Sequence, residues 1–162
     1  MFLQYFKIKR NNYKKRTLSI YQEIVNLSNH FIKNSLNDKN YDFDEVFEIF
    51  SIVTVFYLKK LKDKNTQTNN EISQRIIDNF IKDLDHNFRE KGIGDMSIGK
   101  YVKKYVKKFY YRLKILDKVL KENEDINFVN YVQKFGISNY GNSIKITQDL
   151  TILYNNIVID KQ

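Results

Sequence analysis

Apolar residues recur at intervals of three and four along most of the chain, in segments separated by short polar stretches. The spacing predicts amphipathic α-helices over residues 17–36, 43–61 and 71–90, and from about 98 to 121. The second segment is the most apolar, but its near-continuous apolar run, 49–58, covers only 10 residues. A membrane-spanning helix needs about 20 apolar residues. This segment therefore predicts a central core helix.

The pattern weakens in the last quarter of the chain. Residues 126–135 predict a short helix, and the glycines, asparagines and serines of 136–143 predict a loop. Residues 147–159 fit either a last helix or two short strands about Asn155–Asn156. We favour the helix because an isolated hairpin would have no sheet to join. The expected fold is therefore all-α, a single compact bundle of about five or six helices with a Gly-rich turn between the third and the fourth.

Length and composition indicate one domain, with the basic excess concentrated in two segments. The 162 residues include no cysteine, which excludes disulfides, thiol catalysis and cysteine metal sites. The net charge is +9, and it is concentrated: residues 1–16 hold six basic and no acidic side chains, and residues 98–121 hold nine basic and one acidic. We predict a basic N-terminal arm, 1–16, followed by a single domain, 17–162. The arm lacks the apolar core of a secretory signal, and it either contacts an anionic membrane surface or is a solvated end.

The turn between the third and fourth helices is rich in glycine. Gly92 follows the apolar run of the third helix, where a left-handed cap would end that helix at no steric cost. Gly94 keeps the next link free. Ser97, or alternatively Asp95, is expected to cap the fourth helix, which should begin near Ile98.

The fourth helix has one apolar and one lysine-rich face. The apolar face holds Ile98, Val102, Tyr105, Val106, Phe109, Leu113, Leu116 and Leu120. The opposite face holds Lys100, Lys103, Lys104, Lys107, Lys114, Lys118 and Lys121. Arg112 falls at the edge of the apolar face, so its guanidinium either extends to the rim or is buried with an acidic partner. The candidate partners are Glu90, Asp95 and Asp85.

The segment FREKGIGDMSIGK, followed by FYYR, resembles the ubiquinol–cytochrome c chaperone family. The family pattern is close to L-R-E-M-G-V-G-D, then V-G-K, then F-Y-G-R. The positions that match it are Arg89, Glu90, Gly92, Gly94, Asp95, Gly99, Lys100, Phe109, Tyr110 and Arg112. Lys91 and Tyr111 depart from it, where the family has methionine and glycine. The resemblance covers roughly residues 17–120, and its specific part is 88–112.

The resemblance implies a non-enzymatic assembly chaperone of the respiratory cytochrome bc complex. Such a protein binds newly made cytochrome b before haem insertion and subunit assembly, with no cofactor and no small-molecule substrate. The other implied partners are the ribosome or an anionic membrane surface, and a small partner protein. The implied location is the bacterial cytoplasm or the mitochondrial matrix, peripheral to the inner membrane. Client binding requires an exposed apolar patch, which we expect the second and fourth helices to supply.

The predicted binding surface for client, membrane or ribosome combines the matched motif with the lysine-rich face. Its members are Arg89, Glu90, Gly92, Gly94, Asp95, Lys100, Lys103, Lys104, Tyr105, Lys107, Lys108, Phe109, Tyr110 and Arg112. Two other interpretations stay open. The lysines could form a solvated face only, or the protein could be a basic helical RNA- or DNA-binding module in which the interleaved tyrosines stack on bases.

Catalytic and metal-binding patterns are scarce. The only histidines are His30 and His86. Asp83, His86 and Glu90 share one side of the third helix, a spacing that could suit a metal ion or acid–base chemistry. One histidine with two carboxylates on a surface helix is usually a solvated face, so we predict no metal site and no catalytic residue.

Overall fold

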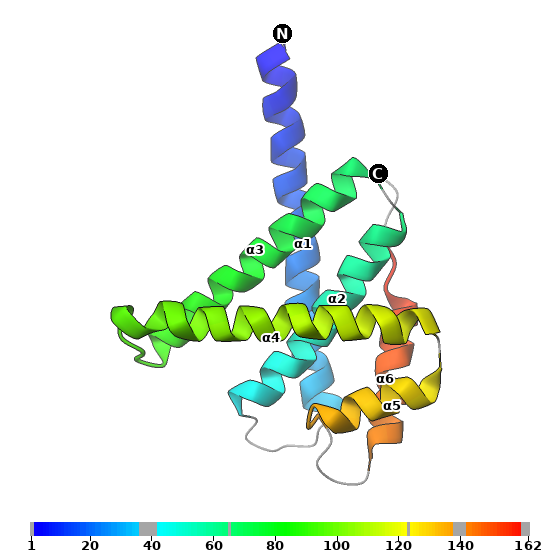
Figure 1. The fold of residues 1–162 in the computed structure, drawn as a ribbon. Helices are drawn as coiled ribbons and strands as arrows, with labels where there is room; N and C mark the ends of the chain where they lie inside the picture. Colours follow the sequence, from blue (N-terminus) through cyan, green and yellow to red (C-terminus); the bar gives the residue numbers. More distant parts are fainter. Residues whose placement is uncertain (1, 36–41, 65, 123, 138–141, 160–162) are drawn as a thin grey trace. The chain divides into compact units, whose positions relative to one another are not determined.

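The structure, a computed structural model, describes residues 2–35, 42–64, 66–122, 124–137 and 142–159. The helices, shown in Figure 1, are α1 (Phe2–Ser35), α2 (Phe43–Asp63), α3 (Gln67–Glu90), α4 (Asp95–Glu122), α5 (Asp125–Lys134) and α6 (Ser143–Asn156). The described residues contain no strand, so the predicted all-α fold class is confirmed. Within these ranges, no helix combines the length and the apolarity that crossing a membrane would require.

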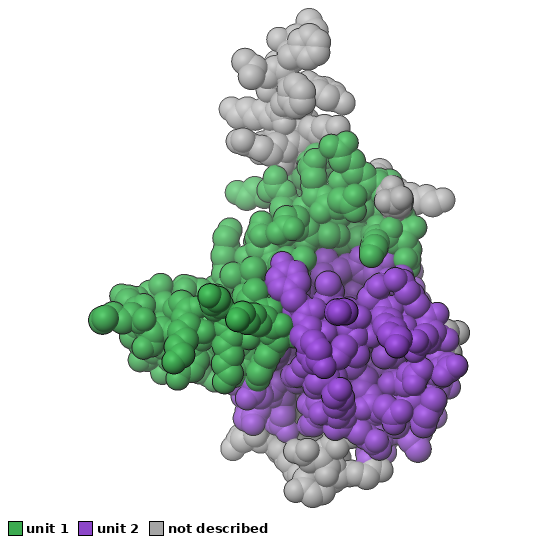
Figure 2. Space-filling model, viewed as in Figure 1, with its two compact units in different colours: residues 1–23, 61–108 green, residues 24–60, 109–162 purple. Residues whose placement is uncertain are grey.

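The chain divides into two compact units, coloured separately in Figure 2. Unit 1 comprises Met1–Glu23 and Leu61–Lys108, and unit 2 comprises Ile24–Lys60 and Phe109–Gln162. The expected division into an arm, 1–16, and one domain stays a prediction.

Unit 1 is built around one face of α3. Five apolar residues at every fourth position of this helix are buried: Ile72, Ile76, Phe80, Leu84 and Phe88. A hydrogen bond of 2.7 Å from the Tyr21 hydroxyl to Asp83 ties α1 to α3. The helix begins at Gln67, four residues before the predicted start, because the Thr66 hydroxyl accepts the Asn69 N–H at 3.1 Å and caps it.

Unit 2 holds the apolar part of α2. Residues 51–58 are all buried. The Phe56 ring contacts Phe128 of α5 and Tyr154 of α6, with centroid distances of 6.2 Å and 4.9 Å. The expected core role of this helix is therefore confirmed.

The bounds of α1 and α6 also differ from the predictions. α1 begins at Phe2 instead of residue 17, because no glycine or proline interrupts its 34 residues even where the apolar spacing is lost. α6 begins at Ser143 and ends at Asn156, ahead of the predicted range 147–159. Its helical state rules out the alternative of two strands about Asn155–Asn156.

Candidate functional site

The turn from α3 to α4 has the left-handed cap that the sequence predicts. Gly92 has φ +78°. Its N–H donates to the Arg89 carbonyl at 2.9 Å, and the Ile93 N–H donates to the Phe88 carbonyl at 3.1 Å. This pair of bonds satisfies two carbonyls at the end of α3, so Gly92 is required by the backbone itself.

The start of α4 differs from the prediction. The helix begins at Asp95, and the Gly94 carbonyl accepts the N–H groups of Ser97 and Ile98 at 2.9 Å and 3.1 Å. Gly94 therefore occupies the capping position, and the predicted caps Ser97 and Asp95 already belong to the first turn. Neither of these two residues is the N-cap.

The charged residues of the turn are paired with one another. Arg89 donates to Asp85 at 2.7 Å and also forms a short hydrogen bond with Asp95, so it links the end of α3 to the first residue of α4. The hydrogen bonds to Asp85 and Asp95 raise the pKa of Arg89, and the bond to Asp85 has the larger effect. Glu90 pairs with His86 at 3.2 Å. The charged residues of the matched motif therefore link the end of α3 to the start of α4.

The carboxylate–histidine set on α3 does not come together as a metal site. His86 lies against Glu90, whereas Asp83 accepts the Tyr21 hydroxyl. In the part of the chain that the structure describes, no group of three or more histidines and acids could hold a metal ion.

The part of α4 within unit 1 exposes lysines on one side and buries aromatic rings on the other. Its exposed lysines are Lys100, Lys103, Lys104 and Lys107. The Tyr105 ring is buried against Phe88, at a centroid distance of 5.1 Å, and the Lys108 ammonium lies over the Tyr105 ring at 4.5 Å. Tyr105 is thus a core residue, and Lys108 partly covers it.

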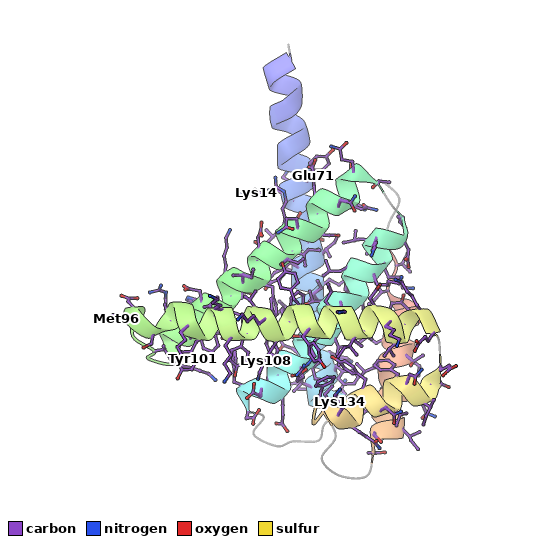
Figure 3. The ribbon with its side chains drawn as sticks, in the orientation of Figure 1. Lys14, Glu71, Met96, Tyr101, Lys108 and Lys134 are labelled. Atoms are coloured by element: carbon purple, nitrogen blue, oxygen red, sulfur yellow. The ribbon has the colours of Figure 1, made fainter. Side chains whose placement is uncertain are left out.

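Apolar groups also reach the surface of α4 in unit 1. Met96, in the first turn, is fully exposed, and Tyr101 is 42% exposed while its ring still contacts Phe88. Figure 3 labels both residues, with Lys108 further along the helix. The surface of this segment therefore combines four lysines with two apolar side chains.

In unit 2, the predicted site residues separate into core and surface. Phe109 is 1% exposed, whereas Tyr110 and its neighbour Tyr111 are about half exposed. Arg112 is buried, which agrees with the predicted alternative of a buried guanidinium with an acidic partner. That partner is none of the three acids that the sequence suggested. Nε and Nη2 of Arg112 donate to the two carboxylate oxygens of Glu48, both at 2.7 Å.

The cluster around this ion pair contains residues that sequence reasoning missed. Phe135, the C-cap residue directly after α5, lies 3.6 Å from the Arg112 guanidinium, measured from the Cζ atom to the ring centroid. Tyr131, one turn earlier, is buried 4.6 Å from Phe135, centroid to centroid. Their spacing of four residues, from α5 to its C-cap, was the only signal in the sequence, and such spacing marks a buried helix face without indicating a charged neighbour.

The exposed candidate surface contains fewer residues than the predicted binding surface. Tyr105, Phe109 and Arg112 are buried and contribute to the core. The exposed members are Arg89, Glu90, Gly92, Gly94, Asp95, Lys100, Lys103, Lys104, Lys107 and Tyr110. The expectation that α2 supplies an exposed apolar patch is wrong for this structure, because its apolar segment is covered.

Among solved structures, the chain is similar to the crystal structure of the Cbp3 homolog from Brucella abortus. The TM-score is 0.80 and the sequence identity is 22%, over 98% of this chain and 90% of that chain. This likeness shows a shared fold. No curated protein matches the sequence.

The sequence also matches a protein-family model described as "Ubiquinol-cytochrome C chaperone" over residues 40–139. The matched range includes the turn from α3 to α4, with the left-handed Gly92 and the Arg89–Asp95 ion pair. It also includes the buried Arg112–Glu48 ion pair. Because the match to the family model spans more than half of the 162 residues, the chain belongs to the ubiquinol-cytochrome C chaperone family.

Proposed function

We propose that the protein is a non-enzymatic assembly chaperone of the respiratory cytochrome bc complex, which binds newly made cytochrome b before haem insertion and subunit assembly. The family match over residues 40–139 is the observation that carries this proposal. The absence of cysteine leaves no thiol nucleophile, which agrees with a binding role.

The client of such a chaperone offers apolar helices, so the chaperone needs apolar groups that can reach them. On α4, Met96 and Tyr101 in unit 1 and Tyr110 and Tyr111 in unit 2 are the exposed groups of this kind. We propose that they contact the client directly.

The lysines of α4 would hold the chaperone at the place of synthesis. Four exposed lysines between residues 100 and 107, with no acidic side chain among them, favour an anionic partner. The partners that fit are the anionic face of the inner membrane or ribosomal RNA. The protein would then act peripherally, in the bacterial cytoplasm or the mitochondrial matrix, with the small partner protein that the family resemblance implies.

A basic RNA- or DNA-binding module is the second candidate function. The observation that favours it is the mixture of exposed lysines with Tyr101, Tyr110 and Tyr111, whose rings could stack on bases. Such binding to naked nucleic acid would weaken steeply with salt.

Site-specific photocrosslinking in cells that make the cytochrome bc complex separates the two functions. A benzophenone amino acid would replace Tyr101 or Tyr110, with Leu18 of α1, which is 51% exposed, as a matched control position. We expect unassembled cytochrome b to be captured from the α4 positions, with or without RNase, and not from position 18. Capture of RNA without cytochrome b would overturn the chaperone proposal in favour of the nucleic-acid module. Normal assembly of the complex in a strain that lacks the gene would also overturn it.

A further inference from the structure

The first half of α4, which belongs to unit 1, carries an exposed face of lysines and valines. This lysine–valine face comprises Gly99, Lys100, Val102, Lys103, Val106 and Lys107. At about 100° per residue, the two valines lie within about 60° of Gly99 on one side, and the three lysines lie within about 100° on the other. The glycine and the lysines are exposed, and the valines are half-buried. The face is therefore open along about 10 Å of helix.

The charge of the lysine–valine face is not neutralised inside unit 1. Residues 96–108 hold five lysines and no acidic side chain. The acids just before them are engaged elsewhere, since Asp95 pairs with Arg89 and Glu90 pairs with His86. In the part of the chain that the structure describes, the three lysines of the face form no ion pair. A partner that complements this face is therefore anionic.

The aromatic rings of this segment lie away from the lysine–valine face. Tyr101 and Lys108 are about half a turn from Gly99 (Figure 3). The Tyr101 ring contacts Phe88 at 5.7 Å, centroid to centroid, and the Tyr105 ring is buried. Base stacking needs free rings, and bidentate phosphate binding favours arginine, which residues 96–108 lack. The face therefore suits a nucleic acid poorly.

A lipid surface fits both kinds of side chain on the face. Lysine ammonium groups bind anionic headgroups, while their methylene stems and neighbouring aliphatic groups lie at the level of the upper acyl chains. Val102 and Val106 are one turn apart, so both reach this level when the helix lies parallel to the membrane. Lysines alone or two half-buried valines alone would hold the protein weakly, and together they provide the two signals that stable attachment requires.

We propose that the lysine–valine face of α4 binds an anionic lipid bilayer, with the helix parallel to the membrane surface and the two valines at the boundary between headgroups and acyl chains. The inference rests on the proposed function and deepens it, because it assigns the lysines to lipid headgroups instead of ribosomal RNA. Met96, fully exposed one turn before Lys100, would then meet a membrane-protein client where the client enters the bilayer.

A dye attached to the face tests its contact with lipid. The sequence has no cysteine, so Gly99→Cys provides a single attachment point for nitrobenzoxadiazole, and a Cβ at this position meets nothing within 4 Å. The full chain is mixed with phosphatidylcholine vesicles that contain or lack phosphatidylglycerol. We expect the dye to brighten and shift to the blue only with the anionic vesicles, and spin-labelled lipid to quench it.

The control for the dye is Gln74→Cys, at an exposed position of α3, where the emission should not change. No change of the emission at position 99, or the same change at both positions, would overturn the proposal.

Substitution of the valines separates the apolar contact from the charge. Val102→Ser/Val106→Ser should weaken binding to anionic vesicles about tenfold, because the apolar contact is lost. Val102→Leu/Val106→Leu should tighten this binding, and it keeps the test decisive if circular dichroism shows that the serine variant is unfolded. Vesicle binding that neither double variant changes would overturn the insertion of the valines.

Ribosomes and single-stranded RNA give the competing outcome. Wild-type protein that binds either of them at moderate salt, but does not bind anionic vesicles, would overturn the lipid assignment in favour of RNA. If the same protein is crosslinked to cytochrome b from position 110, the chaperone function stands while the lipid inference fails. Failure of the function itself would instead show as normal assembly of the complex in the strain that lacks the gene.

Discussion

Arg112 and Glu48 are 64 positions apart in the sequence, and their side chains meet through two hydrogen bonds of 2.7 Å. Both side chains are buried, and the Phe135 ring covers the guanidinium. Burial by itself lowers the pKa of Arg112, but the hydrogen bonds and the charge of Glu48 outweigh burial and raise it. The Arg112 guanidinium therefore stays charged, and its two hydrogen bonds to Glu48 fix α2 against α4 within unit 2.

Loss of one partner should be severe, because it leaves a buried charge alone. We expect Arg112→Ala to lower the free energy of unfolding by about 3–5 kcal/mol, measured by urea denaturation with circular dichroism. The exposed Arg89 is the matched control, and Arg89→Ala should lower the free energy of unfolding far less than Arg112→Ala does, because water screens its ion pairs. The double variant Glu48→Leu/Arg112→Met should recover much of the loss. An Arg112→Ala protein within about 1 kcal/mol of wild type would show that the pair contributes little.

Two glycines near the turn should respond in opposite directions to alanine. Gly92 has φ +78°, so Gly92→Ala forces a side chain into the left-handed region and should destabilise by about 1–2 kcal/mol. Gly99 is inside α4, and a Cβ there meets nothing within 4 Å, so Gly99→Ala should stabilise by about 0.5–1 kcal/mol. Urea unfolding of the two variants checks the signs. Equal effects of the two substitutions would contradict the role of the backbone angle at Gly92.

Most of the helices could be predicted from the sequence because apolar residues recur along them at helical spacing, as they do on the buried face of α3. The boundaries depended on local groups that the periodicity does not include. The side-chain cap at Thr66 moves the start of α3 to Gln67, and the Gly94 carbonyl moves the start of α4 to Asp95. In α1, helical backbone continues through a basic stretch that has no apolar spacing.

The site was only partly predictable, because ion pairs depend on tertiary packing. The helical wheel placed Arg112 correctly at a buried edge, yet all three predicted partners were near in sequence. Asp85 and Asp95 pair with Arg89, and Glu90 pairs with His86. The true partner is on a helix two elements earlier, a relationship that no local pattern in a single sequence indicates.

Two buried tyrosines should make the protein sensitive to alkali. Burial raises the pKa of Tyr21, as do the hydrogen bond and the charge of Asp83. Burial also raises the pKa of Tyr131, helped by the charge of Glu48 and opposed by that of Arg112. The unfolded chain loses these protons near pH 10, whereas the folded protein keeps them, so the free energy of unfolding should fall as the pH rises above about 10.

The expected loss is about 1.4 kcal/mol per pH unit for each tyrosine. It can be measured from urea unfolding between pH 9 and pH 11.5. Tyr21→Phe and Tyr131→Phe should each make the free energy of unfolding fall less steeply with pH, by the amount that corresponds to one proton. If both variants keep the wild-type slope, other groups cause the alkaline loss.

Charge reversal on α4 should separate partner binding from folding. The best positions are the exposed lysines of unit 1: Lys100, Lys103, Lys104 and Lys107. Lys108 is better left intact, because it lies over Tyr105. Substitution of the four by glutamate should reduce binding to anionic vesicles or to ribosomes more than tenfold, since each lysine near an anionic surface contributes about 1 kcal/mol. The melting temperature should change little, because these side chains are exposed.

The matched control carries the same change in net charge elsewhere on the surface. Its four exposed lysines come from α1, α2, α3 and α6: Lys33, Lys62, Lys82 and Lys145. Co-sedimentation with vesicles and with ribosomes, at low and at moderate salt, measures both variants. If binding depends on the position of the lysines, the control keeps most of its affinity while the α4 variant loses it. Equal losses in the two variants would show that the net charge of +9 alone attracts the partner, and that the lysine-rich face of α4 has no specific role.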